Sequence, residues 1–390
     1  MILSSNFLSY LPNNLFQPFY STLTHLNLQR NQFRSLSTNY FLRRLVDLRT
    51  LDLSLNHLYE IFKQDFTGLR HLETLILREN KLTYLPYAVF SRCRTITTLD
   101  LSDNDISLID SNAFRSLYRL KTLLLSNNPL GQRLLTSQLF EPLKNLEYLD
   151  LENTELNSLR PFLFVSNSHL QSIKLRRNNF QSMITDSSTS LQRSFCRAQS
   201  LVEIDLVSTH LRSLDVCTYD QLPSLRRLYL MNNPLHCSCD LFYLKYGDIY
   251  RILLKDGNGF DRRHSDVDVY LDRWITRIEL RRHLEKSHAR GDFHRLPIEL
   301  SLFARCATPK QWSGKEISNI SGIFSQCQQR WSNIEQECQN YCQLENETSD
   351  KPIQTILSKA SRTYLFPIHL FIFTVVFHLR VSFCFAGDVC

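Results

Sequence analysis

The sequence predicts an α/β solenoid, a chain of stacked coils in which each coil opens with a short β-strand. Three observations lead to this fold class. The pattern LxxLxLxxNxL recurs nine times, mostly at a spacing of 24 residues, an aromatic residue recurs between the copies, and most of the eleven cysteines follow the last copy. A single repeat of this length cannot bury its own apolar face, so successive repeats must stack on one another.

Each copy of the pattern predicts one strand followed by one bend. Apolar and polar residues alternate in the LxLxx part, which is typical of a short strand with one buried face. The Asn follows at the bend, where its amide can bond backbone groups of neighbouring turns. Thr154 and Thr209 replace this Asn in two copies, and a hydroxyl can supply part of the same bonding. The copies begin at Leu23, Leu48, Leu72, Ile96, Leu120, Leu146, Leu170, Leu201 and Leu225.

A second half-pattern, LxxLPxxxFxxL, runs between the copies and predicts the filling of the other side of each coil. It is clearest in LTYLPYAVFSRC. Cys93 stands where neighbouring repeats carry leucine, so we expect it to be a small buried apolar residue. The aromatic position recurs as Phe66, Phe90, Phe114, Phe140 and Phe164.

Composition and motifs exclude several classes of function. The chain has 390 residues, enough for two or three domains, and a net charge of +7 without a basic run that interleaves aromatic residues, so we expect no nucleic-acid partner. HExxH, G-x-S-x-G and glycine-rich phosphate loops are missing from the sequence. It therefore predicts no enzyme, cofactor, metal or small-molecule substrate.

Over residues 1–240 the pattern resembles the extracellular leucine-rich repeat proteins with 24-residue repeats. The resemblance implies a curved horseshoe with a parallel β-sheet on its concave face. It also implies that other proteins bind on that face, since members of the family serve in adhesion, guidance and receptor recognition.

The first residues fit the inside of a repeat. Leu3, Asn6 and Leu8 match the second half of the motif, and neither a basic segment followed by an apolar one nor a polar terminal cap precedes the repeats. We therefore expect a fragment or truncated gene product of an extracellular protein, rather than a cytosolic protein.

The stretch NNPLHCSCD at residues 232–240 marks the junction between the last repeat and a cap. With RCATPKQWSG and FSQC further on, it resembles the cysteine-flanked C-terminal cap of the same family. Carried over by position, the resemblance implies the disulfides Cys237–Cys306 and Cys239–Cys327. A zinc site is the alternative, but metal ligands usually come as CxxC pairs, and the flanking residues are of the capping type.

The other cysteines have simpler interpretations. Cys196 and Cys217 lie on the non-strand sides of adjacent coils, where a disulfide between them would pin the long repeat that contains TDSSTS. Cys338 and Cys342 follow the cap, and we expect them to pair with each other or with a partner chain.

The cap carries a long charged insert, residues 245–305, that the family usually lacks. DVDVYLDRWITRIELRRHLEKSHARG predicts an amphipathic helix that ends at Gly291. The tripeptide Arg290, Gly291 and Asp292 is a candidate integrin motif, and the alternative is a plain helix C-terminus with Arg on the dipole and Gly as the stop.

The C-terminal part predicts a glycosylated stalk and an anchor. Asn319 and Asn346 begin N-x-S/T glycosylation signals. The strongly apolar residues 364–386 favour a single-pass membrane anchor, and a cleaved lipid-anchor signal is the alternative. Either anchor would place the repeats outside the cell at the plasma membrane.

The polar strand positions indicate where a protein ligand would bind. The N-terminal half carries a ladder of threonines at one strand position, which indicates a structural role: Thr50, Thr74, Thr98 and Thr122. The later repeats are richer in Tyr and Arg, which dominate binding hot spots. Our candidate ligand-binding residues are Tyr148, Asp150, Glu152, Lys174, Arg176, Arg177, Arg227 and Tyr229.

Together these features predict four parts: repeats at 1–235, a cap at 236–330, a stalk at 331–363 and an anchor at 364–386. The expected function is a cell-surface recognition or adhesion ectodomain that binds an extracellular protein through the repeats. A secreted, matrix-type structural protein and an integrin ligand are the alternatives.

Overall fold

The computed structural model describes residues 1–37, 40–131, 135–181, 191–214, 216–220 and 222–236. Beyond these it describes the short pieces 238–239, 299–300 and 306–308 and the single positions 327, 330, 333, 334 and 338. The chain divides into two compact units, Met1–Tyr341 and Cys342–Cys390. The second unit lies outside the described residues, so the description concerns the first.

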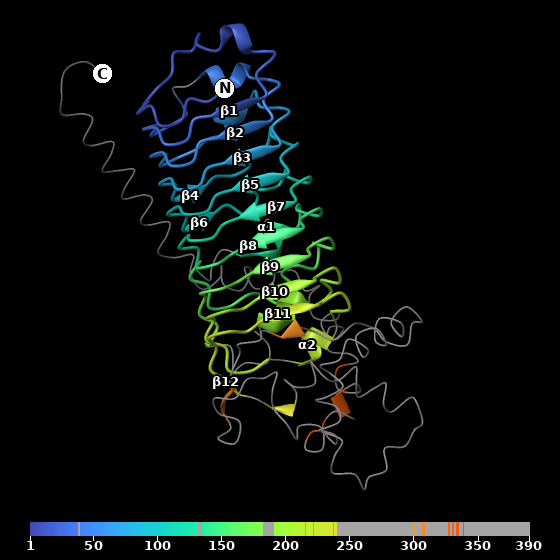
Figure 1. Cartoon of the computed structure of the whole chain (residues 1–390). Coiled ribbons are helices and arrows are strands. Elements are labelled where there is room, and N and C mark those ends of the chain that lie inside the picture. The colour runs from blue at the N-terminus through green and yellow to red at the C-terminus, as the bar shows by residue number, and fades with distance from the viewer. Residues whose placement is uncertain are drawn as a thin grey trace, which may run out of the picture. The chain divides into compact units, whose positions relative to one another are not determined.

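The predicted repeats form one parallel sheet, which confirms the solenoid. Each three-residue strand has a buried middle residue, because that position is always Leu or Ile (Figure 1). Among the described residues the sheet has ten strands, in the order β1 (His25–Asn27), β2 (Thr50–Asp52), β3 (Thr74–Ile76), β5 (Thr98–Asp100), β7 (Thr122–Leu124), β8 (Tyr148–Asp150), β9 (Ser172–Lys174), β10 (Glu203–Asp205), β11 (Arg227–Tyr229) and β13 (Glu299–Leu300).

The register of the sheet follows the repeat. Thr50 pairs with Thr74, and the Thr ladder continues to Thr98 and Thr122. The last strand, β13, comes from the C-terminal end of the predicted insert and adds to β11 with Glu299 opposite Arg227. No copy of the LxxLxLxxNxL pattern covers this strand, so it was not predicted from the sequence.

Short elements connect the strands on the other side of each coil. Two small parallel pairs occur, β4 (Tyr84–Leu85) with β6 (Leu108–Ile109), and β12 (Leu235–His236) with β14 (Cys306–Thr308). The short helices are η1 (Gln17–Phe19), η2 (Tyr40–Arg44), η3 (Lys63–Phe66), α1 (Ser137–Phe140), η5 (Leu191–Phe195) and α2 (Val216–Asp220).

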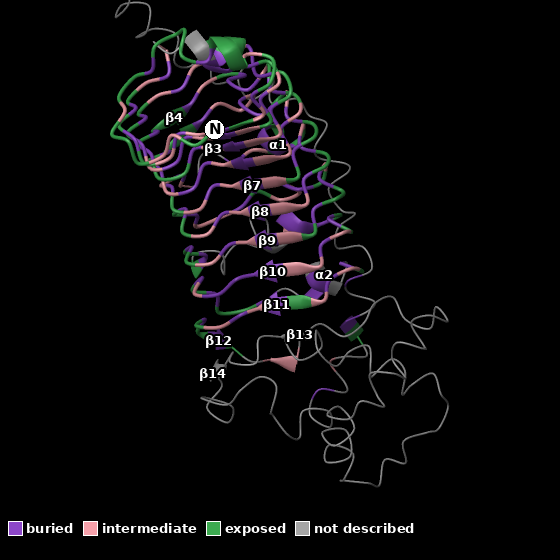
Figure 2. Ribbon diagram, turned by 45° about the horizontal axis from the view of Figure 1, so that its top comes forward, coloured by how far each residue is buried: buried purple, intermediate pink, exposed green. Residues whose placement is uncertain are grey.

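The recurring aromatic residues form the second half of the core, as predicted. Ring centroids of neighbouring repeats lie 5.8 Å apart for Phe66 and Phe90, and 6.3 Å apart for Phe90 and Phe114. A further run joins Phe140, Phe164 and Phe195 at 5.5 and 6.0 Å. All of these side chains are fully buried. In Figure 2 buried residues line the inside of the coils and exposed ones gather at the outer turns.

The repeated Asn side chains tie consecutive coils together. Nδ2 of Asn104 donates to the carbonyl of Leu77 in the preceding coil at 3.0 Å and to that of Leu101 in its own coil at 3.1 Å. Its Oδ1 accepts the N–H of Leu82 at 3.1 Å. The same arrangement recurs at Asn31, Asn56, Asn80, Asn128, Asn178 and Asn233.

The two Thr substitutions keep part of this network, as predicted. Oγ1 of Thr154 donates to the carbonyl of Leu151 at 2.8 Å, and Thr209 does the same to Leu206 at 2.7 Å. Neither hydroxyl reaches a carbonyl of the preceding coil in the way the amide does. The bond that Thr retains is therefore the one inside its own repeat.

Cys93 is buried and free, as expected from its leucine position. Its thiol contacts the carbonyl of Phe66 at 3.6 Å, and burial raises its pKa to about 12. A thiol with so high a pKa is an inert core residue.

Two disulfides between described residues, Cys217–Cys338 and Cys239–Cys327, join the last coils to the region that follows them. Cys239 is bonded to Cys327, which confirms the pairing that the family resemblance implies. Cys237 lies outside the described residues, so its bond to Cys306 stays a prediction. The pairing of β12 with β14 sets Cys306 opposite Leu235, two residues before Cys237.

The predicted bond between Cys196 and Cys217 is wrong, and so is any bond from Cys338 to Cys342. Cys217 is bonded to Cys338, with Cα atoms 4.7 Å apart, and Cys196 is disulfide-bonded elsewhere. Ile334 and Cys338 are buried within the core. The chain after the cap therefore packs back on the last coils, which brings together cysteines 121 residues apart.

Several predicted features fall outside the described residues. These are the charged helix of the insert, Arg290–Gly291–Asp292, the glycosylation signals at Asn319 and Asn346, and the apolar residues 364–386. Across the described part of the chain, no helix is long and apolar enough to span a membrane.

Candidate functional site

The predicted ligand-binding residues lie on or directly after strands β8, β9 and β11, in the C-terminal half of the same sheet. Strand β10 lies between β9 and β11 and adds two acidic residues. We call this surface the sheet-face patch. It comprises Tyr148, Asp150, Glu152, Lys174, Arg176, Arg177, Glu203, Asp205, Arg227 and Tyr229.

A cation–aromatic pair joins strands β8 and β9. The Lys174 Nζ atom lies 5.4 Å from the centroid of the Tyr148 ring. The interaction with the Tyr148 hydroxyl raises the pKa of Lys174, whereas partial burial raises the pKa of Tyr148. Lys174 therefore stays charged, and its ammonium group is held against an aromatic surface that is partly exposed to solvent.

Two aspartates of the patch also shape the bends after their strands. Oδ1 of Asp150 accepts the N–H of Glu152 at 2.9 Å, and Oδ1 of Asp205 accepts that of Val207 at 3.0 Å. Burial raises the pKa of both carboxyl groups. Since Asp52 and Asp100 make the same turn in the N-terminal half, this turn belongs to the repeat rather than to a site.

Ion pairs cross from strand to strand in the later part of the patch. Nε and Nη2 of Arg227 lie 2.8 and 2.7 Å from Oε2 of Glu203, its register partner in β10. Arg177 lies 3.7 Å from Glu152. Each pair holds a long side chain over the sheet, so the patch presents its charges in fixed positions.

Buried polar atoms without hydrogen bonds lie at the centre of the patch. Arg176 Nε is 3.5 Å from Oδ2 of Asp205, which is only 7% exposed, but donates no hydrogen bond among the described residues. Within the same part of the chain, Ser172 Oγ is also buried and unbonded. Unsatisfied buried groups of this kind are uncommon in native proteins and call for an explanation.

The N-terminal half of the same face offers a comparison. It too has ion pairs between coils, which join Arg49 to Glu73 and Arg78 to Asp103. Exposed pairs of this type contribute at most about 1 kcal/mol and occur on many protein surfaces. Aromatic side chains, rather than ion pairs, therefore distinguish the sheet-face patch.

Glu203 and Asp205 were missed by the choice of site residues from sequence. The signal for Glu203 was present, because it precedes Arg227 by the repeat length of 24 residues. The signal for Asp205 was present as well, since Lys174 and Asp205 occupy the fifth position of the copies that begin at Leu170 and Leu201. The register of β9 with β10 sets Asp205 opposite Lys174.

Among the described residues, no group of three or more His, Cys, Asp or Glu side chains is placed to hold a metal ion. Three of the acidic residues of the patch, Glu152, Glu203 and Asp205, are each paired with an arginine. The chemistry that the patch can offer is hydrogen bonding, charge and aromatic contact.

Comparison with known proteins identifies the repeats. Residues 21–82 and 70–130 match the model of the leucine rich repeat family. The fold is similar to that of the leucine-rich repeat protein LIC12759 of Leptospira interrogans, with 23% sequence identity and a TM-score of 0.51. That match covers 60% of this chain and 55% of the other, so the chain spans about half the length of that relative.

A second solved structure is similar over more of the chain. It is an octameric complex of Latrophilin 3, Unc5D and the leucine-rich repeats of FLRT2, with 20% identity and a TM-score of 0.58. The match covers 84% of this chain and 82% of the matched chain. At such identities the likeness concerns the fold. With its nine sequence repeats, its parallel sheet and its disulfide-bonded C-terminal region, the chain is a leucine-rich repeat protein.

Proposed function

We propose that this protein is an extracellular recognition protein that binds a protein ligand through the sheet-face patch. The observation that carries the proposal is the Tyr148–Lys174 pair at strands β8 and β9, beside the solvent-accessible guanidinium groups of Arg176 and Arg177. Tyr and Arg are also the residues that contribute most to protein–protein affinity.

The disulfides support the extracellular assignment. Cys217–Cys338 and Cys239–Cys327 close long loops and are structural, and such bonds persist in oxidising compartments. In the solved octameric complex a repeat domain of this fold is assembled with Latrophilin 3 and Unc5D, so the fold is compatible with protein ligands. The parallel strands also provide a rigid, extended surface, which lowers the entropic cost of binding.

Attachment to the plasma membrane is part of the proposal. It rests on the apolar residues 364–386, which would anchor the chain with the repeats outside. A secreted, matrix-type structural protein is the alternative, in which the same repeats would serve without an anchor. Retention of the full chain on intact cells supports the anchored form, whereas its recovery in the medium supports the secreted form.

The test of ligand binding uses three substitutions in the patch, Tyr148→Ala, Lys174→Glu and Arg176→Glu. The displayed protein is screened against a panel of extracellular proteins, and the affinity of each captured ligand is measured for both forms. Asp150 and Asp205 are left unchanged, because their carboxylates hold the bends after the strands. Loss of three hot-spot side chains should weaken binding by about a hundredfold or more.

A matched control separates the site from general charge effects. Arg92→Glu, Arg94→Glu and Tyr118→Ala change the same residue types on the turns opposite the sheet, where all three side chains are exposed. We expect this variant to bind as the unchanged protein does. Equal affinity of the patch variant and the unchanged protein for every captured ligand would contradict the proposal.

A further inference from the structure

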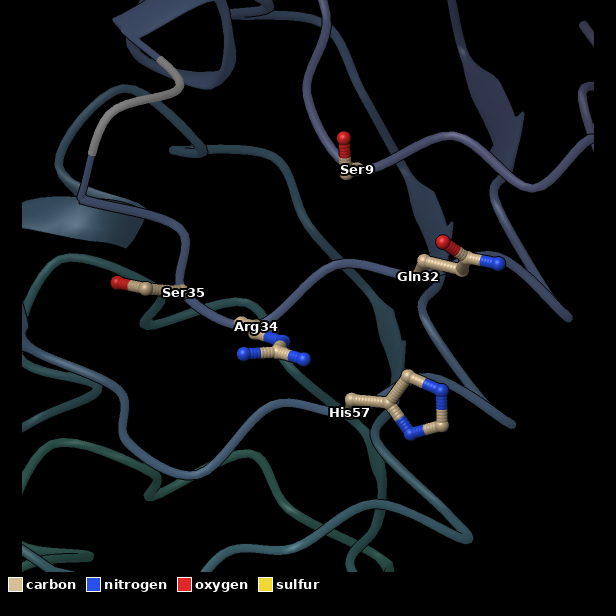
Figure 3. A pocket seen from close by; sticks show the side chains of 5 residues that line it. All are labelled: Ser9, Gln32, Arg34, Ser35 and His57. Atoms are coloured by element: carbon tan, nitrogen blue, oxygen red, sulfur yellow. The ribbon is translucent and has the colours of Figure 1, made fainter.

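A polar pocket of about 630 Å³ lies away from the sheet-face patch, on the turns of the first three coils. It is lined by Ser9, Gln32, Arg34, Ser35 and His57 (Figure 3). Gln32 and His57 each directly follow the repeated Asn of their coil. Ser9 and Arg34 occupy a second equivalent position of the repeat, which lies two residues after the position of Gln32 and His57. The repeat thus stacks polar side chains of successive coils around one opening.

The backbone under this pocket is held firmly. The N–H of Gln32 donates to the carbonyl of Leu8 at 2.8 Å, and the N–H of His57 donates to that of Phe33 at 2.9 Å. Because these hydrogen bonds link the three coils, they fix the backbone positions of the residues that line the pocket. A site that is arranged before binding loses less entropy when its ligand arrives.

The lining residues bear positive charge and hydrogen-bond donors. Arg34 contributes a guanidinium group with five N–H donors, and the His57 ring and the Gln32 amide also donate. None of the five lining residues is acidic, and neither Arg34 nor His57 forms an ion pair with a described residue. Lys81 continues the His57 position in the next coil and extends the positive charge.

Exposed aromatic residues occupy positions next to the lining residues along the chain and across the coils. Tyr59 follows Arg34 in the next coil, where its N–H donates to the Arg34 carbonyl at 3.3 Å, and its side chain is 51% exposed. Tyr10 adjoins Ser9 and is 67% exposed. An aromatic face in water offers an apolar surface with a polar tip, which suits the flat C–H face of a sugar ring.

We propose that this pocket binds an anionic oligosaccharide. Its sulfate or carboxylate groups would meet Arg34 and His57, its hydroxyl groups would bond Ser9 and Gln32, and a ring would stack on Tyr59. The shallow, polar lining does not suit an apolar ligand, and its volume exceeds what a single inorganic anion fills. The site is independent of the sheet-face patch.

The test measures binding of a fluorescent, fully sulfated heparin octasaccharide to the full chain by anisotropy. A desulfated, N-acetylated octasaccharide that keeps its carboxylates and a neutral dextran oligomer of equal length complete the set. We expect saturable binding of the sulfated chain, of the desulfated chain or of both, and none of dextran. The first two results show which anionic group the pocket prefers.

Variants then place the binding in the pocket. The double substitution Arg34→Ala and His57→Ala removes one charge-assisted contact and one ring N–H donor and should weaken binding about tenfold or more. The matched control Arg92→Ala and Arg94→Ala removes two charges on other exposed turns and should change it less than about twofold. Since all four side chains are exposed, folding is not at risk.

Two results would overturn the proposal. One is the lack of saturable binding to either anionic octasaccharide. The other is an equal loss of affinity in both double variants, because the binding would then follow from the net charge of +7 rather than from the pocket. Neither result bears on the protein ligand of the sheet-face patch, whose test uses other residues.

Discussion

Substitution of one of the repeated Asn residues tests how the coils are held together. In Asn104→Ala three donated bonds vanish, to the carbonyls of Leu77, Leu101 and Ser102, together with one accepted bond from the N–H of Leu82. The three carbonyls each keep another donor, namely Asn80, Asn128 and the N–H of Glu79. The N–H of Leu82 is the group left buried without a bond.

The expected loss of stability follows from these lost hydrogen bonds. A buried donor without a partner costs about 1–3 kcal/mol, and each of the other three bonds contributes about 0.5–1.5 kcal/mol. We expect Asn104→Ala to lower the free energy of unfolding by about 4 kcal/mol. Asn104→Thr should cost about half as much, since Thr154 and Thr209 show that a hydroxyl still bonds the carbonyl of its own repeat.

The assay is urea unfolding followed by circular dichroism, with the exposed Asn179→Ala as the matched control. Substitution of Asn179 should change stability by less than about 0.5 kcal/mol. Because solenoids can unfold repeat by repeat, the transition must first be shown to be a single one. A loss below about 1 kcal/mol for Asn104→Ala, or a greater loss for Asn104→Thr than for Asn104→Ala, would refute the reasoning.

Three further predictions follow from the core, the disulfides and the buried carboxyl groups. Phe114→Ala should lower the free energy of unfolding by about 3–5 kcal/mol, because it opens a cavity beside Phe90; a loss like that of the exposed Tyr118→Ala would contradict the stacked core. Peptide mapping without reduction should recover Cys217–Cys338 and Cys239–Cys327, with Cys93 unreactive toward thiol reagents until the protein unfolds; a Cys196–Cys217 peptide would contradict the described pairing. Burial raises the pKa of Asp205 above its ordinary 3.8, so its ionisation opposes folding, and stability is lost as pH rises from 3.8 through the raised pKa. Asp205→Asn keeps the turn acceptor and should weaken this decline in thermal unfolding, and an unchanged pH profile would count against it.

Much of the fold could be predicted because the residues within each repeat determine where its own strand and bend lie. Alternation of Leu with polar residues sets the strand, and the 24-residue period sets the register that pairs Thr50 with Thr74. The buried positions of Asn104 and Phe114 follow from the same period. Nine copies of one short pattern leave the chain little choice of architecture.

The C-terminal region could not be predicted to the same degree, because its contacts join distant residues without a repeating pattern. Cys217 is 121 residues from Cys338, and the nearer Cys196 looked like the natural partner. Strand β13 joins β11 although the chain between Arg227 and Glu299 carries no copy of the motif. Neither the disulfide nor the strand pair can be recognised from the spacing of residues that are close in the sequence.

For the candidate site the sequence indicated which residues share one face of the sheet, but not all of their contacts. It pointed to Tyr148, Lys174 and Arg176 by residue type and position in the repeat. It could not show that Lys174 lies over the Tyr148 ring or that Asp205 is nearly buried beside Arg176. Those contacts depend on side-chain conformation, which the repeat pattern does not determine.

Side-chain footprinting of the protein with a captured ligand tests the central claim most directly. Hydroxyl radicals label exposed tyrosines, and mass spectrometry compares each one in the free and bound forms. Tyr148 and Tyr229 lie on the sheet-face patch, whereas Tyr87 and Tyr118 are exposed on the opposite turns and serve as internal controls. We predict that the ligand protects Tyr148 and Tyr229 and leaves Tyr87 and Tyr118 unchanged. Protection of the control tyrosines, with Tyr148 and Tyr229 labelled as in the free protein, would contradict recognition through this face.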